Sequence, residues 1–325
     1  MTEKEVLALR EGCGLIDRSE RGKLALTGGQ AKEFLAGQVT NDIEALEPGT
    51  GCYAAFLTHK GKMRGDLRVL DLGDELWLDT EREALQALFD MIRRFKIGFD
   101  VELHKRTLER GLLSLVGPDA RRVARAEELP VAEHSSMRAR RGGVDVVIVA
   151  TVDGVDLICA ATDVDAVRTW LESEGAVPVS HAADDVLRVE AGRPRFGVDI
   201  DDTTIPQEAG LNERAVSFTK GCYVGQETVA RLFYKGKPNR HLRGLQLAGP
   251  AAPGDPLRLG EREVGRVGTV VDSPDFGPIA LAMVRREAEP GATVDVGDGG
   301  RATVVELPFS SRTPPAAPGP AAGRA

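Results

Sequence analysis

The densest group of reactive side chains in this sequence lies in residues 220–227, which read K-G-C-Y-V-G-Q-E. Residues 227–233 favour a helix with Glu227 in its first turn, so Cys222 is expected close to a helix N-terminus, with Lys220 beside it as a cation. Both influences favour a thiolate and can lower a cysteine pKa from about 8.5 to roughly 3.5–7.5. We therefore expect Cys222 to be a working thiol that Lys220 activates. The alternative is a small buried hydrophobe, the commonest fate of a free cysteine.

Two carboxylates are the next candidates. Glu190 ends a helical segment, where the helix dipole disfavours a negative charge. A ligand that donates two N–H groups would compensate, and a salt bridge to Arg188, Arg193 or Arg195 would do so equally well. Asp66 follows a glycine-rich turn, from which its side chain could point into a pocket, although capping the turn is the more frequent role of such an aspartate.

The composition narrows the function classes. The chain has 325 residues, a formal net charge of −8 and a pI of about 5.4, which argues against nucleic-acid or anionic-membrane binding driven by net charge. No apolar run reaches the roughly 20 residues of a membrane helix, and the charged N-terminus carries no secretory signal. The cysteines and histidines are scattered without a C-x-x-C pair, so we expect a cytoplasmic protein with no metal site and with Cys13, Cys52 and Cys159 in structural roles.

The elements that position these residues follow a pattern that occurs twice. The first pass has strand character at residues 23–26, 52–57, 67–72, 76–80 and 101–103 and helical spacing at residues 30–36 and 81–95. The second pass has strands at residues 112–116, 144–150, 155–160 and 177–179 and helices at residues 119–126 and 163–174, the latter with Asp163 as its N-cap. Both passes contain the βαββαβ order of a ferredoxin-like unit, which predicts two antiparallel sheets with helices on one face.

The last third of the chain has a different pattern of predicted elements. Residues 180–191 favour a helix capped by Ser180, and beyond residue 240 short β-rich pieces alternate with glycine and proline, at residues 242–247, 265–271, 279–284 and 302–307. This pattern is typical of a small barrel or sandwich. We therefore expect an α+β fold with two ferredoxin-like lobes in residues 1–239, a C-terminal β-barrel in residues 240–310 and a disordered tail in residues 311–325.

Residues 220–227, with the T-V-A-R that follows, resemble the K-G-C-[FY]-x-G-Q-E signature of YgfZ-type folate-binding proteins, relatives of the glycine-cleavage T-protein, an aminomethyltransferase. The similarity covers about residues 12–307 and includes residues 14–19, 34–42, 187–197, 199–200 and 206–211. The resemblance implies a three-lobed cloverleaf, in which two ferredoxin-like lobes and the barrel surround a central channel that binds tetrahydrofolate or a one-carbon derivative.

The resemblance also implies roles for individual residues. The glutamate of the superfamily's L-R-x-E-x-G motif recognises the pterin ring, and Glu190 stands at that position. Asp66 would line the channel, and Cys222 with Lys220 would carry the chemistry. The same signature segment supplies the remaining expected folate contacts, which are Tyr223, Gln226 and Arg231.

Two departures separate this chain from the T-proteins. Those proteins carry an Asp-Asp pair at the G-G-x-x-D-D-L turn, where this chain has Gly65 and Asp66, and they lack the signature cysteine. The resemblance therefore implies a protein that supports iron–sulfur cluster assembly or repair, with iron–sulfur client or assembly proteins as partners. A single thiolate can contact a cluster but cannot hold one that takes four ligands. The alternatives are a folate-dependent aminomethyltransferase or demethylase, and a scaffold that has lost folate.

Overall fold

The computed structural model describes residues 3–310, so the expectation of a disordered tail at residues 311–325 lies outside the described residues. The chain forms two compact units. One comprises the residues up to Ala183 together with Leu211–Ala230, and the other comprises Asp184–Gly210 and the residues from Arg231 onward. The first unit holds two sheets and the second holds a barrel.

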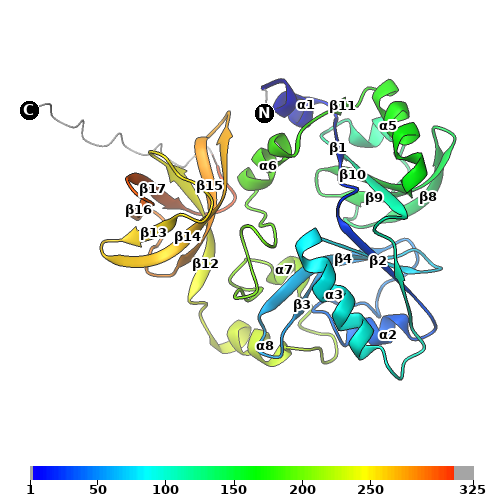
Figure 1. The fold of residues 1–325 in the computed structure, drawn as a ribbon, viewed down its shortest axis with the longest axis horizontal. Coiled ribbons are helices and arrows are strands. Elements are labelled where there is room, and N and C mark those ends of the chain that lie inside the picture. The colour runs from blue at the N-terminus through cyan, green and yellow to red at the C-terminus, as the bar shows by residue number, and fades with distance from the viewer. Residues whose placement is uncertain (1–2, 311–325) are drawn as a thin grey trace, which may run out of the picture. The chain divides into compact units, whose positions relative to one another are not determined.

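The first lobe is a five-stranded antiparallel sheet with the strand order β3-β4-β5-β2-β6, coloured blue to cyan in Figure 1. Its elements are β2 (Gly22–Thr27), α2 (Ala31–Ala36), β3 (Gly51–Leu57), β4 (Met63–Asp71), β5 (Leu76–Thr80), α3 (Arg82–Phe95) and β6 (Glu102–Lys105). Helix α3 buries Ala84, Leu88, Met91 and Ile92, which recur at helical spacing and form one apolar face. The predicted order of helices and strands in this lobe is confirmed.

The second lobe is a six-stranded sheet with the order β11-β1-β7-β10-β9-β8. Its elements are α1 (Glu3–Glu11), β1 (Gly14–Asp17), β7 (Arg110–Val116), α4 (Ala120–Val123), β8 (Ser136–Arg141), β9 (Val144–Thr151), β10 (Gly154–Ala160), η1 (Ala161–Asp163), α5 (Val164–Ser173) and β11 (Val177–Pro178). Strands β11, β7, β10, β9 and β8 repeat the order of β6, β2, β5, β4 and β3 in the first lobe, with β1 inserted between β11 and β7. The two ferredoxin-like units of the predicted fold are thereby confirmed.

Several details of the second lobe differ from expectation. The helix predicted at residues 119–126 is limited to Ala120–Val123. Asp163 occupies the N-cap of α5 but has αR backbone angles and makes no side-chain capping bond, because the turn η1 already leads into the helix. Strand β8 was not predicted, since arginines dominate its sequence, but Met137 and Ala139 pack inward against the lobe's core.

The second unit contains a closed barrel with the strand order β12-β15-β14-β13-β16-β17. Its strands are β12 (Arg240–Leu247), β13 (Pro256–Leu259), β14 (Arg262–Ser273), β15 (Gly277–Arg285), β16 (Thr293–Val296) and β17 (Gly300–Val305). Its core includes Leu245, Leu257, Val264 and Val304. The predicted barrel is confirmed, while the four-residue strands β13 and β16 escaped prediction because they are too short to show a clear alternation.

The remaining helices are α6 (His181–Glu190), α7 (Asn212–Ala215) and α8 (Gln226–Lys235). The Ser180 hydroxyl accepts the Ala183 amide at 3.3 Å, as predicted for the cap of α6. Within residues 3–310, no helix combines the length and apolar character needed to cross a membrane.

Candidate functional site

The signature segment forms a loop that ends where α8 begins at Gln226. Cys222 is exposed in this loop, whereas Cys13 and Cys159 are buried and Cys52 is half-buried. Burial raises the pKa of the Cys13 and Cys52 thiols to about 12 and that of Cys159 to about 11. Cys222 is therefore the most accessible thiol of the four, as a reactive role requires.

Lys220 is held by the backbone of a distant segment. Its ammonium donates hydrogen bonds to the carbonyl oxygens of Ala36, Val39 and Asn41 at 2.5, 2.8 and 2.8 Å, and it lies 5.2 Å from the ring centroid of Tyr223. Burial lowers the pKa of Lys220 to about 8, which leaves the amine mainly charged at pH 7. All three N–H donors are thus used on carbonyls. This arrangement fixes the end of α2 and the segment that follows it to the signature segment. Activation of Cys222 by Lys220 stays a prediction.

The segment that binds Lys220 has further ties to residues near the signature. The Thr40 hydroxyl donates to the Ala215 carbonyl at 2.5 Å, and the Ser217 amide donates to the Thr40 carbonyl at 2.9 Å. The Val224 amide donates to the carbonyl of Gly37 at 3.3 Å. Residues 34–42 stood out in the sequence only through family resemblance. Their hydrogen bonds give a physical reason for their importance, because this segment holds the signature segment in place.

The turn that leads into β4 also touches the signature segment. Gly225 has φ +85°, and a Cβ there would lie 2.5 Å from the carbonyl oxygen of Thr58. Gly61 has φ +74°, and a Cβ there would lie 2.7 Å from Cβ of Thr228. Both positions therefore require glycine. Through this contact, the strand that carries Asp66 begins beside the segment that carries Cys222.

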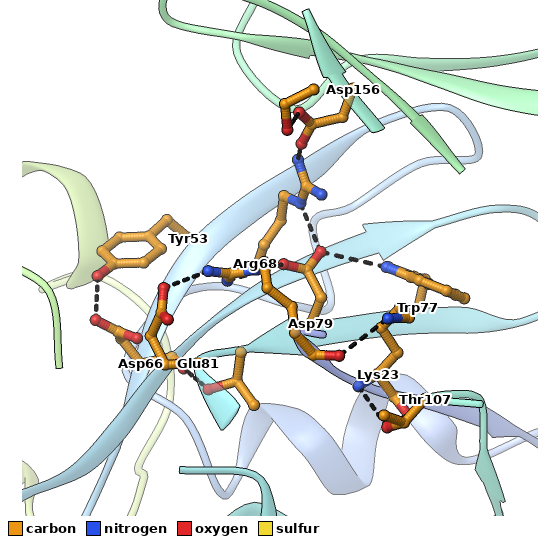
Figure 2. Close-up of polar contacts among 12 residues, drawn as sticks. Lys23, Tyr53, Asp66, Arg68, Trp77, Asp79, Glu81, Thr107 and Asp156 are labelled. Atoms are coloured by element: carbon orange, nitrogen blue, oxygen red, sulfur yellow. Dashed lines mark hydrogen bonds and ion pairs between the residues drawn. The ribbon is translucent and has the colours of Figure 1, made fainter. Parts of the chain in front are cut away.

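Asp66 lies within β4 and is 6% exposed, so it pairs inside a sheet and does not cap a turn. The Tyr53 hydroxyl donates to Asp66 Oδ2 at 2.6 Å (Figure 2). Burial raises the pKa of Asp66 to about 6, Glu81 adds to the rise, and the bond from Tyr53 and the charge of Arg21 oppose it. A carboxyl group that titrates near pH 6 can take up or release a proton under physiological conditions.

Tyr53 is a site residue that the sequence analysis missed. The pairing of β3 with β4 sets Ala55 opposite Asp66, so Tyr53 is the diagonal neighbour of Asp66 on the same face. The Arg214 guanidinium lies 5.4 Å from the Tyr53 ring centroid. Burial and the charge of Asp66 raise the pKa of Tyr53 well above 10, so the phenol stays protonated and keeps donating. If the strand that carries Asp66 had been predicted to begin at residue 63, its pairing with the preceding strand would have placed Tyr53 next to Asp66.

A buried charge network lies behind Asp66 and joins the two lobes (Figure 2). Arg68 on β4 bonds Asp79 on β5 at 2.8 Å and Asp156 on β10 at 2.6 Å. Arg21 bonds Asp79 at 3.0 Å, and the Ser114 hydroxyl donates to Asp156 at 2.6 Å. The two guanidinium groups lower the pKa of Asp79 to about 2. Asp79 therefore stays ionised across the physiological range, and the network fixes the strand that carries Asp66.

Glu190 belongs to the second unit, where it is the last residue of α6. The Ser273 hydroxyl donates to Glu190 Oε1 at 2.5 Å, and the Phe309 amide donates to its backbone carbonyl at 2.9 Å. Arg188 bonds Asp185 and Asp199 at 2.8 and 2.7 Å. Glu190 is half-buried, and its predicted contact with a pterin ring stays a prediction.

The remaining predicted contacts differ in exposure. Tyr223 is buried, which raises the pKa of its phenol to about 12, Gln226 is half-buried, and Arg231 is exposed on α8. In the part of the chain that the structure describes, no group of three or more His, Cys, Asp or Glu side chains could hold a metal ion.

Known proteins resemble this chain along most of its length. The GCVT N-terminal domain family matches residues 1–220, and the glycine cleavage T-protein C-terminal barrel domain family matches residues 240–310. An aminomethyltransferase of Geobacillus thermodenitrificans is 31% identical, over 95% of this chain and 90% of the relative. A chloroplast protein of Arabidopsis thaliana with a provisional transferase name is 27% identical, over 95% of this chain and 74% of the relative. The crystal structure of the glycine cleavage system aminomethyltransferase T from Bartonella henselae aligns with a TM-score of 0.83 and 27% identity, over 94% of this chain and 89% of that chain.

Proposed function

The chain belongs to the glycine-cleavage T-protein family, and we propose that it binds tetrahydrofolate or a one-carbon derivative and uses Cys222 to support iron–sulfur cluster assembly or repair. The binding site is the channel implied by the family resemblance. Glu190 accepts the N–H donors of the pterin ring, Asp66 lines the channel, and Tyr223, Gln226 and Arg231 complete the folate contacts. The partners are iron–sulfur client or assembly proteins in the cytoplasm.

The surroundings of Gly65 are the observation that favours this function over aminomethyl transfer. A Cβ at Gly65 would lie 2.6 Å from Cβ of Ala84 and 2.6 Å from Cε1 of Phe56. Packed side chains thus occupy the space that a second carboxylate would need at this turn. The chain keeps the single carboxyl of Asp66, and its exposed thiol, Cys222, stands where the T-proteins have none.

The residues present have the chemistry that a reduced folate requires. A pterin ring presents adjacent N–H donors, which a carboxylate such as Glu190 can accept in pairs. Asp66, with a pKa near 6, can hold a proton for the basic nitrogens of the folate. Tyr53 keeps that carboxyl in place through its 2.6 Å hydrogen bond. Bound folate supplies a one-carbon carrier, and these residues bind it and control a proton next to it.

The test is the Cys222→Ala variant in cells that lack the protein. We expect this variant to bind tetrahydrofolate in calorimetry as the wild type does and to lose the rescue of iron–sulfur enzyme activity. The matched control is Cys52→Ala, which removes a half-buried thiol from the same unit and should keep full rescue. Full rescue by Cys222→Ala would refute the assignment of this thiol.

A second candidate function is aminomethyl transfer, which the 31% identity to a named aminomethyltransferase favours. Methylene transfer to tetrahydrofolate from an aminomethyl donor measures it directly. Turnover that survives Cys222→Ala and is lost in Asp66→Asn would establish the transferase.

A calorimetric titration with tetrahydrofolate that gives no heat would instead indicate a scaffold that has lost folate binding.

A further inference from the structure

We propose that the first unit carries a second ligand site, a cavity between its two lobes that binds a small organic anion with an apolar body. The cavity has a volume of about 550 Å³ and lies between the β4–β5 turn of the first lobe and strands β8, β9 and β10 of the second lobe. It is independent of the proposed folate site, because none of its lining residues belongs to the signature segment or to the surroundings of Asp66.

The strand register explains why the floor of the cavity is apolar. On one face of the second sheet, Ile158 lies between Leu112 and Val147 in directly paired positions. Trp77 of the first lobe packs into the same cluster, with Leu72 at its edge. Asp156 lies two positions before Ile158 on the same strand, and its buried ion pair with Arg68 closes the inner end of the space between the two lobes. The outer end is left open as a cavity with an aliphatic and aromatic floor.

The rim holds three arginines and three carboxylates, and they are not all paired with one another. Arg106 bonds Glu75 at 2.9 Å, and Arg138 bonds Asp74. Arg106 also bonds Glu109, which lies outside the cavity lining, at 2.8 Å. The third carboxylate of the rim, Asp145, bonds Arg140, which lies outside the cavity lining, at 3.2 Å. Each carboxylate of the rim thus has its own guanidinium partner.

One guanidinium on this rim has no carboxylate partner among the described residues. The guanidinium of Arg110 lines the cavity and forms no hydrogen bond or ion pair with any residue in the range 3–310. An anion that accepts hydrogen bonds from the Arg110 guanidinium would complete the rim.

These features define the ligand class. The volume lies in the range of roughly 300–1,000 Å³ that is common for small-molecule sites. The arginines select a carboxylate or phosphate group, because a guanidinium presents N–H donors in the geometry of those anions. The floor selects a compact apolar or planar body attached to that group, which a free inorganic ion lacks.

Isothermal titration of the full-length protein with four probes tests the proposal. We expect saturable binding of benzoate or phenyl phosphate, much weaker binding of inorganic phosphate and no binding of benzamide, the neutral analogue of benzoate. The benzoate and phenyl phosphate arms decide between a carboxylate and a phosphate ligand. Saturating tetrahydrofolate should leave probe binding unchanged, whereas displacement of the probe would place it in the folate site and overturn the proposal.

Charge variants locate the probe. Arg110→Gln should weaken binding about tenfold, as expected for the loss of a charged hydrogen bond. Arg122→Gln, which removes an exposed positive charge from α4 of the same lobe, should have no effect. Asp145→Asn removes a negative charge from the rim and should tighten binding, which keeps the test decisive if Arg110→Gln does not fold. Equal affinities in all three variants would refute the site.

Discussion

Asp66 shows how a strand can hold a carboxyl group close to its titration point at neutral pH. Burial raises its pKa from 3.8 to about 6, so between these pH values the folded protein binds a proton that the unfolded chain has released. The free energy of unfolding therefore falls as the pH rises through this window, and above pH 6 the full cost is present. A shift of this size corresponds to roughly 3 kcal/mol.

The first prediction concerns the Asp66→Asn variant. The amide keeps an oxygen acceptor for the Tyr53 hydroxyl but does not titrate, so the variant should lose this pH dependence. Urea unfolding should show a higher free energy of unfolding than the wild type at pH 8 and a similar value near pH 4. Parallel pH profiles for the two proteins would show that Asp66 titrates normally. Gained stability with lost function would be typical of a strained site residue.

At the residue scale, the sequence named candidate residues but did not reveal their contacts. The type and spacing of the residues around Cys222 were enough to nominate it, whereas Asp66 became a candidate mainly through the family resemblance. The partners of Lys220 could not be predicted, since its carbonyl acceptors lie 179 to 184 positions earlier in the chain. Tyr53 was missed because the strand that carries Asp66 was expected to begin at residue 67, whereas β4 begins at Met63.

At the scale of elements, the two glycines of the signature segment are expected to tolerate an alanine substitution differently. Gly225 must be glycine because a Cβ there meets the Thr58 carbonyl oxygen at 2.5 Å and the backbone has φ +85°. At Gly221, a Cβ would meet nothing within 4 Å. The two positions share a loop but differ in the space around them and in backbone conformation, since only Gly225 has a positive φ, so Gly221 serves as the control.

The second prediction is that Gly225→Ala destabilises the protein and Gly221→Ala does not. We expect a loss of about 1–3 kcal/mol at position 225, from the strained backbone and the displaced turn, and a change within about 0.5 kcal/mol at position 221. Urea unfolding measures both values. Because the turn at residues 58–62 leads to Asp66, tetrahydrofolate binding should weaken in Gly225→Ala alone. Equal behaviour of the two variants would argue against the contact.

Elements with a strong apolar period were predictable, and those without one were not. Helix α3 shows a continuous apolar face and was predicted within a residue of its bounds, Arg82–Phe95. Strand β8 presents S-M-R-A-R-R, in which only Met137 and Ala139 face the core, so its composition hides its alternation. An edge strand can carry such charges because one side of it is solvated, and the charges also discourage pairing with other chains.

At the scale of the molecule, the repeat explains why the fold class was predictable although the position of strand β1 was not. Each lobe builds most of its sheet from consecutive residues, so local patterns revealed the βαββαβ order twice. Strand β1, Gly14–Asp17, breaks this rule because it precedes the first lobe in sequence and pairs with β7 and β11 of the second. No local pattern shows which lobe a short strand will join, because the choice depends on pairing with residues about 100 and about 160 positions later.

The last prediction tests what joins the two lobes. Two ion pairs bridge them in contrasting surroundings. Arg68 bonds Asp79 and Asp156 with all three side chains nearly buried, whereas Arg138 bonds Asp74 at the exposed edge, with side chains 58% and 68% exposed. Removing a partner from a buried pair leaves charges without compensation and costs about 3–5 kcal/mol, while an exposed pair contributes about 0–1 kcal/mol.

Arg68→Met should therefore lower the free energy of unfolding by several times as much as Arg138→Met. Trp77 supplies a local reporter, because its indole N–H donates to Asp79 at 3.3 Å and the ring is 1% exposed. Its fluorescence should change in Arg68→Met under native conditions and stay unchanged in Arg138→Met. If the two variants lose the same stability, the apolar seam around Trp77 and Ile158 holds the lobes together, and the buried charges serve only to fix the strand that carries Asp66.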